Sequence, residues 1–458
     1  MARLPLAGGC WALISCSALV ATALMPGSRA REDVYTIVRV ADNTTIVPGG
    51  ARGAFTFFSA PLCTGGTAYF TGSPASGEGG IFTAALSGTT PPETIGIAVK
   101  TGPPHWASQL PGAPDGATIF DVGFAASGPE GVAFVAYPQP NQDLSLARLV
   151  LSVDGKLTSV VDTHSALSDG GTVAKFYQAS APGLGGQAVA FHAVSTAGVD
   201  GWWLATLSAK ADGAPTISKI VDNSTAMPVA GAPRFHTFTG DMAMASDGSF
   251  LAFSGTNGLR ITDPNARLGV FSWTKATNAL SCVANDNDTM VPGLDGSWRF
   301  EGFGARSSVS TTGAICFTAQ AINGRDPPHI GIWCKGVTTT SGSYEADAHF
   351  RRSPNGLVVV ADSTMAIPAS PTGAKFQYLD YPSVSPDGST VVFQGNDDRG
   401  RRGVYAVVVG GPVIKLLDWQ DKIAGQDIFN IQLSQQSFDG ESVSIFVAAD
   451  DAAAEEGN

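Results

Sequence analysis

Short apolar runs of four to eight residues recur along most of the chain, and clusters rich in Gly, Pro, Asp and Asn separate them. Runs such as "TAYFTG", "GVAFVAY" and "STVVFQG" are too short for helices and are rich in β-branched and aromatic residues. This pattern predicts short β-strands joined by tight turns. The 55 glycines and the low charged fraction of 14% favour the same interpretation.

Two phenylalanines mark a repeat that occurs seven times. The first phenylalanines are Phe55, Phe120, Phe176, Phe235, Phe300, Phe376 and Phe429. The second ones follow 14 to 18 residues later and are Phe70, Phe134, Phe191, Phe253, Phe317, Phe393 and Phe446. We interpret both sets as core residues between neighbouring units.

Each repeat has the layout of four antiparallel strands, A to D from the centre outward. An Asp-Gly turn such as "SPDGS" (385–389) separates the two phenylalanines, and two further apolar runs follow a variable loop. Units of this kind are blades, so the sequence predicts an all-β, seven-bladed β-propeller over residues 31–450 with a polar tail at 451–458. The seventh copy ends after two strands. Residues 34–41 match strand D, and we expect this N-terminal outer strand to close the ring.

Residues 1–30 have the features of a secretory signal peptide: an early arginine, an apolar run and a small-residue cleavage site ending at Ala30. A lipoprotein signal with Cys16 acylated is the alternative. No later segment is apolar for the roughly 18 residues of a membrane span. The sequence therefore predicts a protein secreted to the extracellular space or periplasm, and we expect a monomer.

The chain has 39 acidic and 27 basic residues, a formal charge of −12. This charge argues against nucleic acid as a partner. Cys316 and Cys334 are equidistant from the centre of a predicted hairpin, so we expect them to face each other and form a disulfide.

The connections from strand D to strand A resemble one another, as in "VADNTTIVPGGARGAF" (40–55). An aspartate follows strand D in six copies, namely Asp42, Asp162, Asp222, Asp286, Asp362 and Asp418. We expect these carboxylates to bind nearby backbone N–H groups in turns, with calcium as a possible cofactor in the alternative interpretation. Asn43, Asn223 and Asn287 begin glycosylation motifs, whose use depends on the host.

The "SPDG" turns and the A–B hairpin pattern resemble TolB-like propeller repeats, and the seven-copy layout is similar to exported tandem-repeat proteins of unknown role. The resemblance covers residues 36–450 and implies the fold. It implies no functional residue, because propellers carry many activities.

The residue after each first phenylalanine is polar in all seven copies. By strand alternation these side chains should line one level at the mouth of the central channel. A wet channel lining explains them without any chemistry. The catalytic hypothesis places Asp121, Tyr177, His236 and Glu301, from successive blades, in one pocket as general acids and bases.

Arginines gather in the B-to-C loops of blades 4 to 6. They are Arg260, Arg267, Arg325, Arg399, Arg401 and Arg402. Guanidinium groups suit carboxylates, although pairing with neighbouring aspartates is an equal alternative. His329 lies in the same loops, and Tyr137 and Trp202, which we expect in the loops of blades 2 and 3, are candidates for stacking on sugars.

Three functions follow from these candidates. The first is a binding module for an extracellular glycan, an acidic polysaccharide above all. The second is an enzyme on the same face, a polysaccharide lyase or glycoside hydrolase using His236 or Tyr177. The third is a protein-docking scaffold, which would require an exposed apolar patch on the ring.

Overall fold

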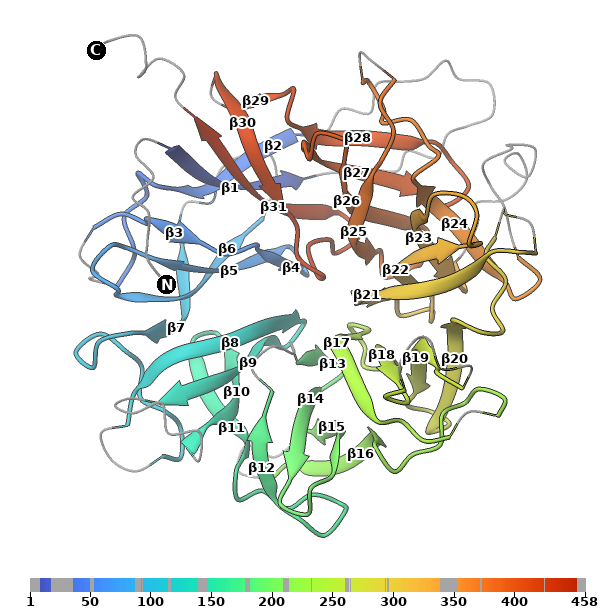
Figure 1. Ribbon diagram of the computed structural model, residues 1–458. Coiled ribbons are helices and arrows are strands. Elements are labelled where there is room, and N and C mark those ends of the chain that lie inside the picture. Colours follow the sequence, from blue (N-terminus) through green and yellow to red (C-terminus); the bar gives the residue numbers. More distant parts are fainter. Residues whose placement is uncertain are drawn as a thin grey trace.

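The computed structural model describes residues 9–17 and 36–450, except 50–52, 87–91, 93, 114–116, 139–145, 178–181, 209–213, 232, 260–262, 264, 293, 295, 338–352, 371–372 and 424. Seven blades surround a central channel, and no helix occurs in these residues (Figure 1). The predicted all-β, seven-bladed propeller is therefore confirmed.

Blades 1 to 3 comprise the following strands. Blade 1 has β3 (Phe57–Phe58), β4 (Leu62–Thr64), β5 (Thr67–Ser73), β6 (Gly79–Ala85) and β7 (Gly96–Thr101). Blade 2 has β8 (Ile119–Gly128), β9 (Gly131–Pro138), β10 (Arg148–Val153) and β11 (Lys156–Asp162). Blade 3 has β12 (Val173–Phe176), β13 (Gly183–Gly185), β14 (Ala188–Ser195), β15 (Asp200–Thr206) and β16 (Thr216–Asp222). In blades 1 and 3 the predicted single inner strand is broken into two pieces.

Blades 4 to 6 each have four uninterrupted antiparallel strands. Blade 4 has β17 (Thr237–Met244), β18 (Phe250–Thr256), β19 (Leu268–Thr274) and β20 (Ala279–Asn285). Blade 5 has β21 (Arg299–Val309), β22 (Ile315–Ile322), β23 (His329–Lys335) and β24 (Leu357–Asp362). Blade 6 has β25 (Tyr378–Val384), β26 (Thr390–Asn396), β27 (Arg402–Val408) and β28 (Val413–Asp418).

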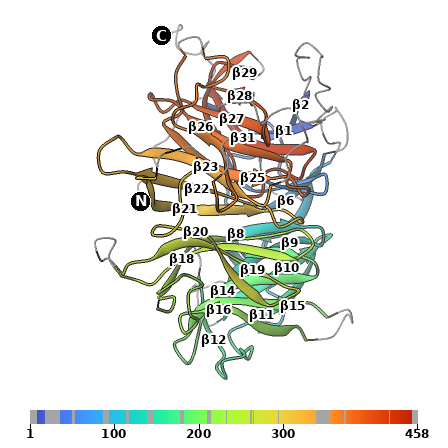
Figure 2. The same cartoon turned by 90° about the vertical axis from the view of Figure 1, so that its right-hand side faces the viewer.

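Blade 7 joins the two ends of the chain. Its sheet order is β2-β1-β31-β30-β29, in which β29 (Lys422–Ile423), β30 (Gln426–Gln432) and β31 (Ser442–Asp450) come from the C-terminal end. The predicted N-terminal outer strand is confirmed as β2 (Thr36–Asp42). The third place is taken by β1 (Gly9–Ser17), which lies within the expected signal peptide and sits between β31 and β2 (Figures 1 and 2).

The core consists of apolar clusters that lie between neighbouring blades. In blade 6, for example, Phe376 packs edge-on against Tyr405 and Phe393, with ring centroids 5.0 and 6.0 Å apart, and all three belong to a cluster that includes Ile332 and Val358 of blade 5. These rings are at most 1% exposed. The repeated aromatic residues therefore hold the blades together, as expected for residues of this volume.

The hydrogen bond that opens each inner strand identifies its first core residue. The backbone N–H groups of Phe55, Phe235 and Phe376 donate to carbonyls of the preceding D-to-A turns at 3.1, 3.0 and 3.3 Å. In blades 2 and 3 the equivalent bonds come from Ile119 and Val173, at 2.9 and 3.2 Å. The repeat in these two blades therefore begins at Ile119 and Val173, not at the phenylalanines assigned from the sequence.

The prediction that all seven first phenylalanines are core residues is consequently wrong for two of them. Phe120 is 37% exposed and Phe429 is 51% exposed, whereas Ile119 and Ile428 beside them are 0% and 5% exposed. A shift of one residue along a strand moves a side chain to the opposite face. Phe176 is buried, but three residues beyond Val173.

The aspartates after strand D hold the D-to-A turns, as predicted. In blade 3, the Asp222 Oδ1 atom accepts hydrogen bonds from the Ser224 N–H at 3.0 Å and from the Thr225 hydroxyl at 2.7 Å. Blade 4 is an exception, because Asn285 instead of the predicted Asp286 accepts the bonds from the N–H groups of residues 287 and 288.

The disulfide between Cys316 and Cys334 is confirmed. The two residues are direct partners in the β22–β23 pairing, with Cα atoms 4.1 Å apart. A disulfide is consistent with an oxidising compartment. No helix in the described part of the chain is long and apolar enough to cross a membrane.

Candidate functional site

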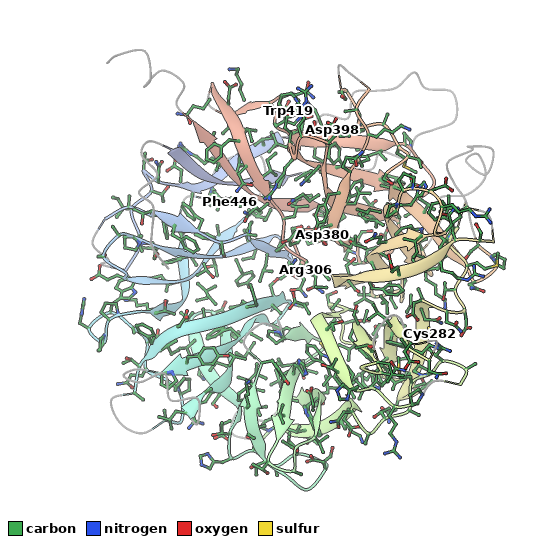
Figure 3. All side chains as sticks on the ribbon, in the orientation of Figure 1. Cys282, Arg306, Asp380, Asp398, Trp419 and Phe446 are labelled. Carbon is green, nitrogen blue, oxygen red and sulfur yellow. A yellow bond between two sulfur atoms is a disulfide. The ribbon has the colours of Figure 1, made fainter. Side chains whose placement is uncertain are left out.

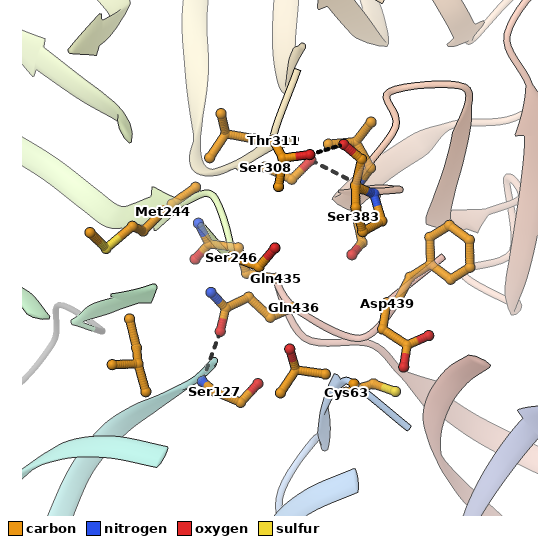
Figure 4. Close-up of a pocket in the computed structure, with 18 of the residues that line it drawn as sticks. Cys63, Ser127, Met244, Ser246, Ser308, Thr311, Ser383, Gln435, Gln436 and Asp439 are labelled. Atoms are coloured by element: carbon orange, nitrogen blue, oxygen red, sulfur yellow. Dashed lines mark hydrogen bonds between the residues drawn. The ribbon is translucent and has the colours of Figure 1, made fainter. Parts of the chain in front are cut away.

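A segment of blade 7 crosses the central channel. It is the connection between β30 and β31, and Figure 4 shows its Gln435 and Gln436 at the middle of the ring. The Gln435 amide donates to the carbonyl oxygen of Ser307 at 2.5 Å, and the Gln436 side-chain oxygen accepts the N–H of Ser127 at 3.0 Å. The Gln436 carbonyl also accepts the N–H of Cys63 at 2.6 Å. Blade 7 is thereby bonded from inside the channel to blades 1, 2 and 5.

This segment, which we call the plug, separates two hollows. Gln435 and Gln436 line both the hollow in Figure 4, of about 240 Å³, and a larger one of about 810 Å³. The larger hollow, called the cup below, is lined near its mouth by Thr56, Phe57 and Asp121, which follow D-to-A connections. The cup therefore ends blindly at the plug, on the side where the inner strands begin.

One wall of the cup is apolar. Phe57 of blade 1 and Phe124 of blade 2 line it, and each is 56% exposed. Phe57 lies in the interrupted inner strand of blade 1, and Phe124 lies in a bulge of β8 between Val122 and Ala125. Such bulges re-aim side chains at barrel rims and near sites.

The opposite wall carries charge. Arg306 of β21 lies between two nearly buried carboxylates, with its Nε atom 3.5 Å from Asp241 and one terminal nitrogen 3.9 Å from Asp380. Its guanidinium also stacks 4.4 Å from the ring centroid of Tyr381. Figure 3 shows Arg306 and Asp380 near the centre of the ring. Asp241 and Arg306 line the cup, so their charges face any occupant.

Three bulges place these charges at one level. β17, β21 and β25 each carry a register shift at the channel, between Thr239 and Ala243, Phe303 and Ser307, and Asp380 and Ser383. The sequence interpretation did not identify Asp241, Arg306 or Asp380. A signal was present, because Gly240, Gly304 and Pro382 lie within the inner strands, and glycine or proline inside a strand often marks a bulge.

Tyr378 stands beside this charged wall and is 45% exposed. Its hydroxyl donates to Asp380 at 2.8 Å. Burial, followed by the charge of Asp380, raises the pKa of Tyr378 far above its ordinary value. The phenol therefore stays protonated near neutral pH, and its proton is shared with Asp380. Asp380 also accepts the N–H of Tyr381, a residue held at a φ of 53°.

The four predicted catalytic residues do not share one level. His236 directly follows its first core residue and is exposed, and Glu301 likewise follows Phe300 and is half-buried. Asp121 is two positions beyond Ile119 and lines the cup, whereas Tyr177 is four beyond Val173. The level itself is not polar throughout, since it contains Phe120, Ala174 and Phe429.

Tyr177 belongs to an aromatic stack on blade 3. Its ring lies 4.0 Å from that of His192, which in turn lies 4.8 Å from Trp202. Asp200 is 2.8 Å from the His192 Nε2 atom and 3.4 Å from the Tyr177 hydroxyl, which donates to it. Burial and Asp200 raise the pKa of Tyr177. This group therefore serves poorly as a base at neutral pH.

The two predicted sugar-stacking residues are buried instead of lying in exposed loops. Trp202 is 1% exposed on β15, between His192 and the core, and Tyr137 is 4% exposed on β9. The expected location in loops is therefore wrong for both, although Tyr137 still lines the cup. His329 is half-buried, and its ring meets Trp298 edge-on at 4.5 Å.

The rim arginines are largely engaged with the protein. Arg401 pairs with Asp397 through its Nε atom at 2.7 Å and stacks 3.7 Å from the Trp419 ring. Arg402 donates to the Asn430 side chain at 2.9 Å, next to the cup. The Arg267 guanidinium donates to a neighbouring carbonyl. Arg325 and Arg399 are the exposed arginines of these loops, while Arg260 lies outside the described residues.

In the described ranges, no group of three or more His, Cys, Asp or Glu side chains is arranged to hold a metal ion. No protein-family model matches the chain, and no curated protein matches it in sequence.

Solved structures with similar folds include TolB proteins and a β-propeller domain. A prolyl endopeptidase has 11% identity and a TM-score of 0.45 over 86% of this chain, which spans 50% of that protein. A putative TolB from Agrobacterium tumefaciens has 13% identity and a TM-score of 0.37, covering 96% of this chain and 99% of its own. An oligogalacturonate lyase in complex with manganese has 11% identity and a TM-score of 0.40, covering 86% and 89%. These similarities concern the fold alone.

Proposed function

We propose that this propeller is a protein-docking module and that its cup receives a short extended segment with apolar and basic side chains. The observation that carries the proposal is the apolar wall of a blind hollow, where Phe57 and Phe124 are each 56% exposed. Exposed apolar groups beside polar ones are typical of binding sites. Phenylalanine has no polar edge for sugar hydroxyls, so an apolar side chain is its better partner.

Size and charge define the occupant further. A hollow of about 810 Å³ holds a few side chains and not a folded domain. Asp121, Asp241 and Asp380 in and beside it outnumber two cations, Arg306 in its wall and Arg402 next to it. The field in the cup therefore favours lysine or arginine on the ligand and disfavours a uronate.

The acidic polysaccharide is the alternative ligand, and the exposed Arg325 and Arg399 support it. Three of the five described rim arginines already donate to groups of the protein. Fewer guanidinium groups are therefore available to a uronate than the sequence analysis expected. Of the two candidate bases for a lyase, Tyr177 is held protonated by its raised pKa, which leaves the exposed His236.

The test measures binding by fluorescence anisotropy with ten-residue peptides that vary in charge and in phenylalanine content. Peptides with both lysine and phenylalanine should bind, and Phe124→Ser should weaken them at least about tenfold, equivalent to about 1.4 kcal/mol. Ile46→Ser is the matched control, because Ile46 is 66% exposed on a D-to-A turn outside the cup. The control should bind within about twofold of the parent protein.

Two outcomes would overturn the proposal. One is peptide binding that Phe124→Ser and Ile46→Ser affect equally. The other is a lack of peptide binding together with salt-sensitive retention on a uronate polysaccharide that Arg325→Ala abolishes. Ultraviolet absorbance with the same polysaccharides reports any unsaturated product of elimination, so a lyase is detected in the same experiment.

A further inference from the structure

In blade 7 the position of the third strand is occupied by β1, which belongs to the expected signal peptide. β1 pairs with β31 over nine consecutive residue pairs, from Gly9 opposite Asp450 to Ser17 opposite Ser442. On its other edge β1 pairs with β2, including Ala12 opposite Asp42. The described structure gives β2 no other strand partner.

The pairing of β1 reproduces that of the third strand in other blades. In blades 3 and 6 a small residue, Gly201 or Gly403, faces the turn aspartate at the end of strand D, as Ala12 does. The register then shifts immediately before a large residue two positions later, at Trp203 and Tyr405. β1 shifts at the same point, before Ile14. The third-strand position of a blade therefore accepts a strand that has a small residue followed two positions later by a large apolar residue.

Removal of residues 1–30 on export would empty this place. The edge of β31 would then present unpaired N–H and C=O groups, which are a template for another strand. On one face of that edge Phe446 and Ala448 are 3% and 0% exposed. The emptied place would thus be bounded by apolar side chains and by a free hydrogen-bonding edge.

β2 is fixed in its place by packing against blade 1. Val40, Ala41 and Val47, at and just after β2, are at most 6% exposed and pack in one cluster with Phe55 and Phe58 of blade 1. A move to the edge of β31 would shift β2 by about one strand spacing, roughly 4.8 Å, and break these contacts. The loss of packing opposes closure of the place.

We propose that the exported protein carries a strand-acceptor slot between β31 and β2, and that it binds an extended apolar segment of a partner protein. The segment would run antiparallel to β31 over about the nine residues that β1 pairs. Its main chain supplies the hydrogen bonds, and the small and large residues described above supply specificity. The proposal rests on removal of residues 1–30 and is independent of the cup.

The first measurement is the N-terminal sequence of the folded, exported protein by mass spectrometry. The second is binding of a fluorescent peptide of residues 9–17 with both cysteines replaced by serine, and the matched control peptide carries Ile14→Asp. We expect a chain that begins at Arg31, saturable one-to-one binding of the first peptide, a higher melting temperature in its presence, and at least tenfold weaker binding of the control.

Three results would overturn the slot. A folded chain that retains residues 9–17 would show that its own segment fills the place. A chain that begins at Arg31 and binds neither peptide would show that blade 7 has closed. Equal binding of both peptides would show that the contact has no strand-specific register.

Discussion

The two sides of the channel wall are built differently from the same repeat. In blades 4 to 6 the inner strands are continuous, each has a bulge, and the first phenylalanines such as Phe376 are buried. In blades 7, 1 and 2 the inner strand is interrupted or shifted by one residue, and Phe429 and Phe57 reach solvent. The first side presents the Arg306 ion pairs to the cup, and the second presents phenylalanine rings.

The difference shows that one repeat can serve two purposes. Where a branched aliphatic residue such as Ile119 takes the first core position, it fills the blade interface and the adjacent phenylalanine reaches solvent on the opposite face. The fold is preserved, and an apolar surface is added at the channel mouth. Alanine variants at a buried and at an exposed phenylalanine of the repeat test this difference directly.

The largest effect is expected from truncation of a buried first phenylalanine. Phe376→Ala should lower the free energy of unfolding by about 3–5 kcal/mol, because it leaves a cavity between blades 5 and 6. Phe429→Ala, at the position assigned as equivalent from the sequence, should change it by less than about 0.5 kcal/mol. Denaturant unfolding measures both. Equal losses would contradict the shifted register of blade 7.

The disulfide should contribute the next largest effect. It joins residues 18 apart in blade 5. The double variant Cys316→Ala, Cys334→Ala should lose about 3 kcal/mol of stability, because the unfolded chain gains freedom. A reductant should lower the melting temperature of the parent but not of this variant. Cys282→Ser, at a free cysteine, is the control and should keep the reductant effect.

Arg306→Ala should destabilise the charged side of the wall by about 2 kcal/mol, since it leaves two nearly buried carboxylates without their cation. The value is set below that of a fully buried pair because the Arg306 side chain is 28% exposed. Urea unfolding at low salt measures it, with Arg325→Ala as the exposed control. Adding Asp380→Asn should recover part of the loss, and a double variant that is less stable still would contradict the ion pair.

The smallest effect concerns the D-to-A turns. The stability lost on removing a turn aspartate should be the same on both sides of the channel wall. Asp42→Ala and Asp222→Ala should each cost about 1 kcal/mol, since each removes an acceptor of turn hydrogen bonds. Burial opposes ionisation of Asp222, but hydrogen bonds from Lys219, Ser224 and Thr225 outweigh it and lower its pKa. The pKa of Asp42 is lowered in the same way.

A lowered pKa in the folded state gives the sign of the pH dependence. The stabilisation by these carboxylates is complete above the unfolded pKa of about 3.9 and is lost as the pH falls through the lower folded value. Thermal unfolding between about pH 2 and pH 6 should therefore show the cost of both alanine variants shrinking together at acid pH. A cost that persists at the lowest pH, or differs between the two, would contradict equivalent turns.

Local pattern was sufficient for much of the fold. Asp-Gly turns, short apolar runs and a sevenfold repeat predict the propeller, and the equal distances of Cys316 and Cys334 from a hairpin centre predict their bond. Each of these features depends on residues close together in the sequence. The register of Phe120 and Phe429 could not be obtained this way, because an isoleucine and a phenylalanine in adjacent positions are equally apolar, and the neighbouring blade decides which is buried.

The sequence by itself determined the class of fold, the number of blades, the closing outer strand and the aspartate turns, because periodicity and turn chemistry are local. Only the tertiary structure decided where the cup lies. Asp241, Arg306 and Asp380 are far apart in the chain and meet because bulges in three blades aim at one axis. The plug likewise meets Ser127 and Ser307 because the ring closes around it, and no local pattern encodes that closure.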